Sequence, residues 1–325
     1  MSASRAESGE SGEIKVAISA CLLGQNVRFD GGHKRDPFLV EVLGEFVTFL
    51  PVCPELELGL GVPRPTIRLE RRGEEVRLVD PKHGLDHTAA MSRLARARVD
   101  ELAADPDLCG WVLKKDSPSC GLFRVKVWDP NGVPAKDGTG AFAAVLRERL
   151  PLLPAEEEGR LHDARLRENF YERVFAYRRL KDLFRGRWKL GDLVRFHTAE
   201  KLLLLAHDEP GYRALGKLVA GAKALPRAEL AARYQEQFMR ALETIATTRK
   251  NVNVLQHAAG FFKEAEVPDR RELAERIEEY RRGLVPLIVP ITLLRHLVRR
   301  HGTEYLAGQT WLEPHPKELL LRNHV

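Results

Sequence analysis

The sequence predicts two domains of different class, an α/β domain followed by an all-α domain. Three observations support this prediction: apolar runs that end at cysteines in the first half, helical spacing of apolar residues almost throughout the second half, and the segment Pro151–Pro154 between them. A chain of 325 residues is long enough to bury two cores. We place the domains at residues 13–150 and 151–325, and we expect the polar, Gly- and Ser-rich residues 1–12 to be a disordered tail.

Two short β-prone runs, residues 14–20 and 46–52, predict buried parallel strands that end at Cys21 and Cys53. Residues 36–45 between them have apolar side chains at helical spacing, so strand, helix and strand follow one another as in a βαβ unit. Further elements of this domain are predicted as a helix at 88–104, strands at 110–114 and 123–128, and a helix within 138–149. The site of an open α/β sheet lies beyond the carboxyl ends of its strands, where the cysteines fall.

Prolines break regular structure, so Pro151–Pro154 is predicted to be a hinge, and Glu156–Glu158 is predicted to start a helix. Apolar residues then recur at helical spacing, and we find no β-alternation and no internal repeat. Helices are predicted at 161–185, 191–207, 211–222, 227–248, 251–264, 269–282 and 290–301.

The net charge of +6 is unevenly spread along the chain. Residues 1–150 hold 21 of the 52 basic and 22 of the 46 acidic residues, which leaves 31 basic and 24 acidic residues in 151–325. A basic domain beside a neutral one fits a polyanionic partner, because Lys and Arg pair with phosphates. An excess of this size is also ordinary for a protein surface, and charge alone favours that interpretation.

No uncharged apolar run approaches the ~20 residues of a membrane-spanning helix, and the N-terminus has no secretory signal. We therefore expect a cytoplasmic protein with no membrane partner. In that reducing compartment the four cysteines are expected to be thiols or ligands of a metal rather than disulfides.

Cys21, Cys53 and Cys120 are distant in sequence but can converge at one edge of the sheet. Three thiolates with an open position suit either a catalytic zinc or a 4Fe-4S cluster with one unligated iron. Cys109 can be a fourth ligand, although its place at the start of an apolar strand favours a buried structural thiol.

Glu55 follows Cys53 by two residues, and Ser117 precedes Cys120 by three, so both are candidate catalytic residues. A carboxyl group in a partly dry pocket can act as a general acid or base. The alternatives are structural, because Glu55 can cap a helix or turn and Ser117 and Ser119 can be N-caps. From spacing alone we favour these structural roles.

In the second domain a dense series of Arg and Lys between residues 160 and 187 is interleaved with aromatic residues. This mixture can bind RNA by phosphate contact and stacking, and it is equally typical of an amphipathic helix with an aromatic core face. The histidines form no HExxH pair, so we interpret them as core or surface residues: His197, His207, His257, His296 and His315.

Several motifs of the first 150 residues together resemble the thiouracil desulfidase family, TudS. They are Ser-Ala-Cys21-Leu-Leu-Gly, Val-Arg-Phe-Asp-Gly-Gly, Pro-Val-Cys53-Pro-Glu55, Gly-Leu-Gly-Val-Pro-Arg-Pro and Lys-Lys-Asp-Ser117-Pro-Ser-Cys120-Gly. Residues 151–325 resemble the helical YbgA-like domain through Arg-Glu-Asn-Phe, Asn-Val-Leu-Gln-His, Val-Pro-Leu-Ile-Val-Pro and the terminal Pro-His-Pro-Lys-Glu-Leu-Leu-Leu-Arg-Asn. The fusion of the two resembles the RudS-type desulfidases of tRNA.

The resemblance implies that Cys21, Cys53 and Cys120 hold a 4Fe-4S cluster with one open iron, with Glu55 and Ser117 beside the substrate. It implies the conversion of 4-thiouridine in tRNA to uridine and sulfide. A thiocarbonyl sulfur is a soft donor for the open iron, which would act as a Lewis acid while water attacks the ring carbon. The helical domain would then bind tRNA.

Two other functions remain open from the sequence. The first is a desulfidase of free thiouracil or thionucleosides, in which the helical domain serves for oligomerisation or as a lid. The second is a redox-sensing or RNA-binding protein whose metal site is only structural. Replacement of Glu55 with the metal retained would distinguish this last function from an enzyme.

Overall fold

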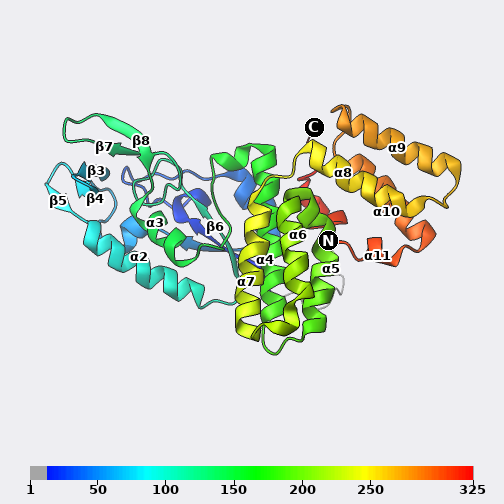
Figure 1. Cartoon of the computed structure of the whole chain (residues 1–325). Helices are drawn as coiled ribbons and strands as arrows, with labels where there is room; N and C mark the ends of the chain where they lie inside the picture. Colours follow the sequence, from blue (N-terminus) through cyan, green and yellow to red (C-terminus); the bar gives the residue numbers. More distant parts are fainter. Residues whose placement is uncertain (1–12, 325) are drawn as a thin grey trace, which may run out of the picture. The chain divides into compact units, whose positions relative to one another are not determined.

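The computed structural model describes residues 13–324, so the expected tail at 1–12 lies outside the described residues. The chain separates into two compact units, the first ending at Gly159 and the second beginning at Arg160. Strands occur in the first unit and long helices fill the second (Figure 1). No helix of residues 13–324 combines the length and apolar character needed to cross a membrane.

A parallel sheet forms the centre of the first unit, which confirms the predicted α/β class. Within the described chain its strand order is β2-β1-β6-β9, and every pair in it is parallel. The strands are β1 (Lys15–Ser19), β2 (Thr48–Val52), β6 (Leu108–Leu113) and β9 (Ala155–Glu157). All of β6 and most of β1 are buried, as their continuous apolar runs require.

Helices flank this sheet where the apolar spacing predicts them, with one local difference. The predicted helices at 88–104 and within 138–149 are α2 (Thr88–Ala103) and α3 (Ala141–Arg149), which pack against each other. The helical segment between β1 and β2 is instead a π-helical turn at Phe38–Val42 followed by a 3-10 turn at Leu43–Glu45. The short helix α1 (Pro54–Glu57) begins directly after Cys53.

A second sheet in the first unit was not predicted. Its order is β5-β4-β3-β7-β8 among the described strands, and the run at 123–128 belongs to it rather than to the parallel sheet. The strands are β3 (Arg68–Arg72), β4 (Glu75–Asp80), β5 (Leu85–Asp86), β7 (Val125–Trp128) and β8 (Pro134–Gly138). Charged side chains occupy four of the five positions of β3 and three of the six positions of β4, and some of them form ion pairs, such as Arg68–Glu70. β3 has one apolar residue, Leu69, and β4 alternates over only the four residues Glu75–Leu78, so the sequence signal for strands is weak here.

The first unit ends at Gly159, nine residues beyond the boundary expected at residue 150. Glu156–Glu158 does not start a helix, because Ala155–Glu157 pairs with β6 as the edge strand β9. The Glu157 carboxylate is buried and accepts the N–H groups of Leu122 at 2.8 Å and Phe123 at 3.1 Å. These two bonds satisfy a charge that would otherwise be costly to bury, and they hold the loop that follows Cys120.

The second unit is helical, and its described residues contain no strand. Its helices are α4 (Ala164–Phe184), α5 (Leu190–His207), α6 (Glu209–Ala220), α7 (Arg227–Glu243), α8 (Thr248–Ala259), α9 (Val267–Arg281), α10 (Ile288–His301) and α11 (Glu304–Ala307). Helices α4 to α7 pack as one bundle, and α8, α9 and α10 pack on one another beside it (Figure 1).

The basic and aromatic series of α4 is largely a core and ion-pair arrangement. Phe170 and Tyr171 are fully buried. The Arg178 guanidinium pairs with Asp182 at 2.8 Å, and Arg179 pairs with Glu200 at 2.7 Å. The amphipathic interpretation therefore accounts for these residues.

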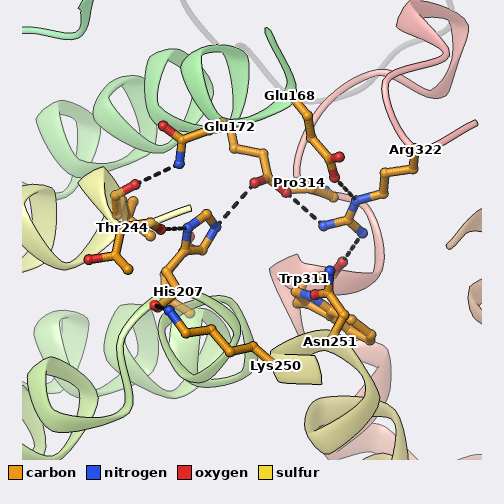
Figure 2. Close-up of polar contacts among 12 residues, drawn as sticks. Glu168, Glu172, His207, Thr244, Lys250, Asn251, Trp311, Pro314 and Arg322 are labelled. Atoms are coloured by element: carbon orange, nitrogen blue, oxygen red, sulfur yellow. Dashed lines mark hydrogen bonds and ion pairs between the residues drawn. The ribbon is translucent and has the colours of Figure 1, made fainter. Parts of the chain in front are cut away.

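A buried ionic network ties α4 to the end of the chain (Figure 2). The Glu172 carboxylate accepts bonds from His207 Nε2 at 3.1 Å and from the Arg322 guanidinium at 2.7 Å. His207 Nδ1 lies 2.7 Å from the Thr244 carbonyl oxygen. Both ring nitrogens of His207 therefore lie within hydrogen-bond distance of oxygen atoms. Burial raises the pKa of Glu172, but its bond to His207 and the charge of Arg322 outweigh this and hold the pKa well below its usual range.

We predict that Glu172→Gln destabilises the second unit by about 1–3 kcal/mol at neutral pH, because the buried Arg322 guanidinium keeps only Glu168 as an ion-pair partner and His207 faces a neutral amide group. The pKa of the Glu172 carboxyl group is lower in the folded protein than in the unfolded chain, where it is about 4.3. Ionised Glu172 therefore stabilises the fold at pH values above about 4.3, and this stabilisation is lost as the pH falls from there through the folded-state pKa. The difference between variant and wild type should therefore shrink in acid. Hydrogen exchange in peptides of α4 and of residues 310–324 measures both effects.

The matched control is Glu236→Gln, which makes the same change at a half-exposed ion pair on α7. Such surface pairs contribute about 0–1 kcal/mol, so protection in α4 should stay unchanged. Equal protection of Glu172→Gln and wild type at neutral pH would contradict the stabilising role of the network.

Candidate active site

The carboxyl ends of β1, β2 and β6 meet at one edge of the parallel sheet. In the register of these strands Ser19 lies beside Val52, and Ile18 lies between Pro51 and Val112. Each strand leads directly into a segment that carries a cysteine. The parallel register therefore brings three distant segments of the chain together, as the sequence predicted.

A cavity of about 330 Å³ lies at this edge, and Cys21, Cys53, Cys120, Glu55 and Ser117 all line it. Cys21 lies in the 3-10 turn that follows β1, and Cys53 is the residue that precedes α1. Cys120 lies in the turn after β6. The structure thus places all five residues singled out from the sequence around one cavity. Cys109 is fully buried in β6 and does not line it.

The turn around Cys120 is too tight for any residue but glycine at two positions. A Cβ atom on Gly121 would lie 2.9 Å from the Ser117 carbonyl oxygen and 2.5 Å from Val125 Cγ2. One on Gly140 would lie 2.5 Å from the Ser119 carbonyl oxygen. These two glycines therefore let the backbone close around Cys120, which explains the Ser-Cys-Gly sequence physically.

Burial dominates the electrostatics of the three thiols and raises each pKa. Cys21 rises to about 11, although Lys114 opposes the shift. Burial also raises the pKa of Cys53. It raises that of Cys120 more strongly, because this thiol is fully buried, and the nearby Glu55 carboxylate and the other two thiols raise it further. Deprotonating three such thiols together requires a compensating positive charge.

A 4Fe-4S cluster supplies that charge and takes thiolate sulfur as its ligand, so the donor set fits such a group. In residues 13–324 no three His, Cys, Asp or Glu side chains converge tightly enough to ligate one metal ion. The cysteines instead surround a cavity, and the thiolates of a cluster each bind a different iron. Cys21, Cys53 and Cys120 are the residues that would hold it.

Glu55 is fixed through both of its carboxylate oxygens. Arg64 donates to Oε2 from Nε at 2.9 Å and from a terminal nitrogen at 2.7 Å, and the buried Ser119 hydroxyl donates to Oε1 at 3.0 Å. The side chains of Arg64 and Glu55 are 3% and 14% exposed. Glu55 is therefore not a helix cap, because its carboxylate accepts hydrogen bonds from the side chains of Arg64 and Ser119.

Arg64 was not assigned a role from the sequence, although it lies in the motif Gly-Leu-Gly-Val-Pro-Arg-Pro. Besides Glu55, its guanidinium donates to the carbonyl oxygens of Gly61 and Val27, both at 2.9 Å. It therefore joins Glu55 to the loop that follows Cys21. A buried arginine with four such bonds orients the carboxylate and fixes its distance from the thiols.

Ser117 has the turn-capping role that its spacing suggested, and it also lines the cavity. Its hydroxyl oxygen accepts the N–H groups of Ser119 at 3.2 Å and Cys120 at 3.0 Å. The hydroxyl proton of Ser117 remains available to donate. Capping and substrate contact are thus compatible at this residue.

Basic residues surround the cavity: Arg28, Lys34, Arg64, Lys114 and Lys115 line it, with Glu55 and Asp116 as the acidic lining residues. The Lys114 ammonium is bound to Glu158, and its backbone N–H donates to the Ser19 hydroxyl at 2.9 Å. Arg28 pairs with Asp30 at 3.3 Å. Lys115 pairs with Asp116 at 3.7 Å and Arg64 with Glu55, so among the described residues Lys34 is the basic lining residue that has no ion pair.

Comparisons with known proteins address the two halves separately. A family model described as 2-thiouracil desulfurase matches residues 16–158, and one described as a protein of unknown function, DUF1722, matches residues 201–316. The uncharacterized protein YbgA of Escherichia coli (strain K12) is 32% identical over 153 residues, which span 46% of this chain and 90% of YbgA. A solved structure titled [4Fe-4S]-dependent thiouracil desulfidase TudS is 35% identical, covering 46% of this chain and 95% of that one, with a TM-score of 0.38.

Proposed function

We propose that this chain, which belongs to the 2-thiouracil desulfurase family, is an iron-sulfur desulfidase of 4-thiouridine in tRNA. Its desulfurase domain is followed in the same chain by a DUF1722 (YbgA-like) domain. The observation that carries the proposal is the convergence of Cys21, Cys53 and Cys120 with Glu55 in one cavity. The reaction is a hydrolysis, in which the thiocarbonyl and water give a carbonyl and hydrogen sulfide. No electron is transferred overall.

The cluster, when bound, would supply an open iron as a Lewis acid for the soft sulfur of the substrate. Glu55 would take a proton from the attacking water or hand one to the ring. Arg64 and Ser119 hold its carboxylate so that it need not reorient during the reaction. Ser117 would orient the water or the base through its hydroxyl proton.

A lysine at the edge of the cavity favours a nucleotide over a free base. The Lys34 side chain has no ion-pair partner in the described part of the chain. Phosphate groups of an RNA nucleotide can pair with such a residue, whereas uncharged thiouracil cannot. A 4-thiouridine buried in folded tRNA would also have to be extruded at a cost of a few kcal/mol, and basic contacts to the backbone offset such a cost. The competing substrate is free thiouracil, after which the family is described.

The test compares three substrates with protein purified without oxygen and assayed for iron and sulfide. We expect loss of near-ultraviolet absorbance and release of sulfide with 4-thiouridine-containing tRNA. Its kcat/KM should exceed that of the nucleoside or of 2-thiouracil by at least about tenfold, the equivalent of 1.4 kcal/mol of backbone contact. Raising the salt concentration should slow the tRNA reaction more than the others, because only tRNA releases counterions on binding.

Equal or faster turnover of 2-thiouracil would instead establish a free-base desulfidase. A full complement of iron without turnover of any of the three substrates would establish a structural or sensing site.

A further inference from the structure

Residues 114–124 connect β6 to β7 and carry two of the residues that line the thiol cavity, Ser117 and Cys120. We call this segment the cysteine loop. Its middle is a tight turn, in which the Ser117 hydroxyl accepts the backbone N–H of Cys120 at 3.0 Å. The start of α3 supports this turn, since the N–H of Ala141 donates to the Pro118 carbonyl oxygen at 2.9 Å. The position of the turn also depends on the two ends of the loop, which a different part of the chain holds.

Glu158 holds the first end of the cysteine loop. Its carboxylate accepts the backbone N–H of Lys115 at 2.7 Å and is ion-paired with the ammonium group of Lys114. Its own N–H donates to the carbonyl oxygen of Leu113, the last residue of β6, at 3.2 Å. Glu158 is 8% exposed, so these bonds are largely shielded from water. One buried carboxylate therefore fixes the direction in which the loop leaves β6.

Glu157 holds the second end of the loop. One oxygen of its carboxylate accepts the backbone N–H groups of both Leu122 and Phe123, which lie shortly before β7. Glu157 belongs to the edge strand β9, which is anchored by its pairing with β6. Two neighbouring residues thus hold both ends of the cysteine loop, and we call Glu157 and Glu158 the acidic clamp. Neither of them lines the thiol cavity.

The backbone is strained beside each point that the acidic clamp holds. Within residues 13–159 only two residues other than glycine have a positive φ, Asp116 at 59° and Arg124 at 54°. Asp116 directly follows Lys115, and Arg124 directly follows Phe123. A residue with a Cβ atom adopts this left-handed conformation at a cost, and it keeps the conformation where surrounding contacts fix the backbone. The hydrogen bonds of the acidic clamp are such contacts at both ends of the loop.

We propose that the acidic clamp positions Cys120 for cluster binding. Without its bonds the strained ends of the cysteine loop would relax, and the Cys120 sulfur would leave the place from which it holds an iron. Glu157 and Glu158 are positioning residues, because they act through the backbone of the loop. The inference rests on the proposed function in one respect, namely that Cys120 is a ligand of a 4Fe-4S cluster.

The test measures how fast an iron chelator bleaches the visible absorbance of the cluster in the full-length protein, prepared without oxygen and assayed for iron. Glu157→Leu places an apolar side chain at a buried position but removes the acceptor of two N–H groups. Its cluster should be lost at least about tenfold faster than that of the wild type, the equivalent of 1.4 kcal/mol. Glu157→Gln should lose its cluster at the wild-type rate, because the amide oxygen can accept the same two bonds.

Glu158→Leu tests the other end of the loop and should also accelerate the loss of the cluster. It keeps the inference open to refutation if Glu157→Leu does not fold, which thermal unfolding shows. Adding Arg124→Gly to Glu157→Leu should slow the loss again, because Arg124 is exposed and glycine adopts a positive φ without strain. This change would not correct a general loss of stability.

The matched control is Asp80→Leu. Asp80 is a buried carboxylate of the same unit that accepts the backbone N–H groups of Lys82 at 2.8 Å and His83 at 3.3 Å, and it does not line the cavity. The variant should lower thermal stability while its cluster is lost at the wild-type rate. This comparison separates the positioning of Cys120 from destabilisation of the whole unit.

Loss of the cluster at the wild-type rate in a folded Glu157→Leu or Glu158→Leu protein overturns the inference. Equally fast loss in Asp80→Leu, or a failure of Arg124→Gly to slow the loss, also overturns it. These outcomes leave the proposed function intact. A wild-type protein that binds no iron would refute the cluster and both proposals with it, whereas iron without turnover of any substrate would refute the proposed reaction alone.

Discussion

Replacing Cys120 with serine is expected to reduce bound iron from about four to below about one per chain and to abolish desulfidation. The Cys120 thiol is buried among Cys21, Cys53 and Glu55, with a strongly raised pKa. A serine oxygen there is a harder and more basic ligand than a thiolate, so it is a poor substitute toward iron. Iron and sulfide assays with an optical spectrum, made without oxygen, measure the loss independently of activity.

The control for Cys120→Ser is Cys109→Ala, which removes the remaining cysteine of the chain. Cys109 is buried in β6 and does not line the cavity, so iron content and activity per folded molecule should stay at the wild-type level. Circular dichroism of both variants shows whether each is folded. Full iron in Cys120→Ser, or its loss in Cys109→Ala, would contradict the three-cysteine ligand set.

The convergence of the cysteines was predictable because it follows from sheet geometry. Cys21 and Cys53 each follow a continuous apolar run, and such runs form parallel strands whose carboxyl ends share one edge. The places of Glu55 and Ser117 do not follow from sheet geometry, because spacing alone favours capping roles for both and only the family resemblance implies that they lie beside the substrate. Apolar residues that recur every two or every 3.6 residues indicate a strand or a helix from the local sequence, without knowledge of tertiary contacts.

The second sheet and strand β9 were missed because tertiary contacts decide them. Glu157 lies in an acidic run that is typical of a helix start, yet it is buried in β9 because the N–H groups of Leu122 and Phe123 meet its carboxylate. Arg64 is a similar case, since only the fold shows that its guanidinium reaches Glu55 and Val27. From the sequence alone a charged residue is expected at the protein surface, and its burial is recognised only when the fold shows its partners.

Glu55→Gln is expected to lower kcat by about a hundredfold to ten-thousandfold while the full iron content is retained. Glutamine keeps the shape of the side chain but neither takes up nor releases a proton at neutral pH. Its amide group also turns a donor toward Arg64 or Ser119, both of which donate to Glu55 in the native site. The measurement combines single-turnover desulfidation of 4-thiouridine-containing tRNA with the iron assay and optical spectrum.

Chemical rescue separates proton transfer by Glu55 from a merely structural role. Glu55→Ala opens space in the cavity for formate, a small carboxylate that can move the same proton. Formate should then restore part of the activity of Glu55→Ala and leave that of Glu55→Gln unchanged, because the glutamine side chain still fills the space. Glu101→Gln, at an exposed carboxylate of α2, should behave as wild type. Wild-type turnover of Glu55→Gln would remove Glu55 from the reaction and leave Arg64 and Ser119 as parts of a structural ion pair.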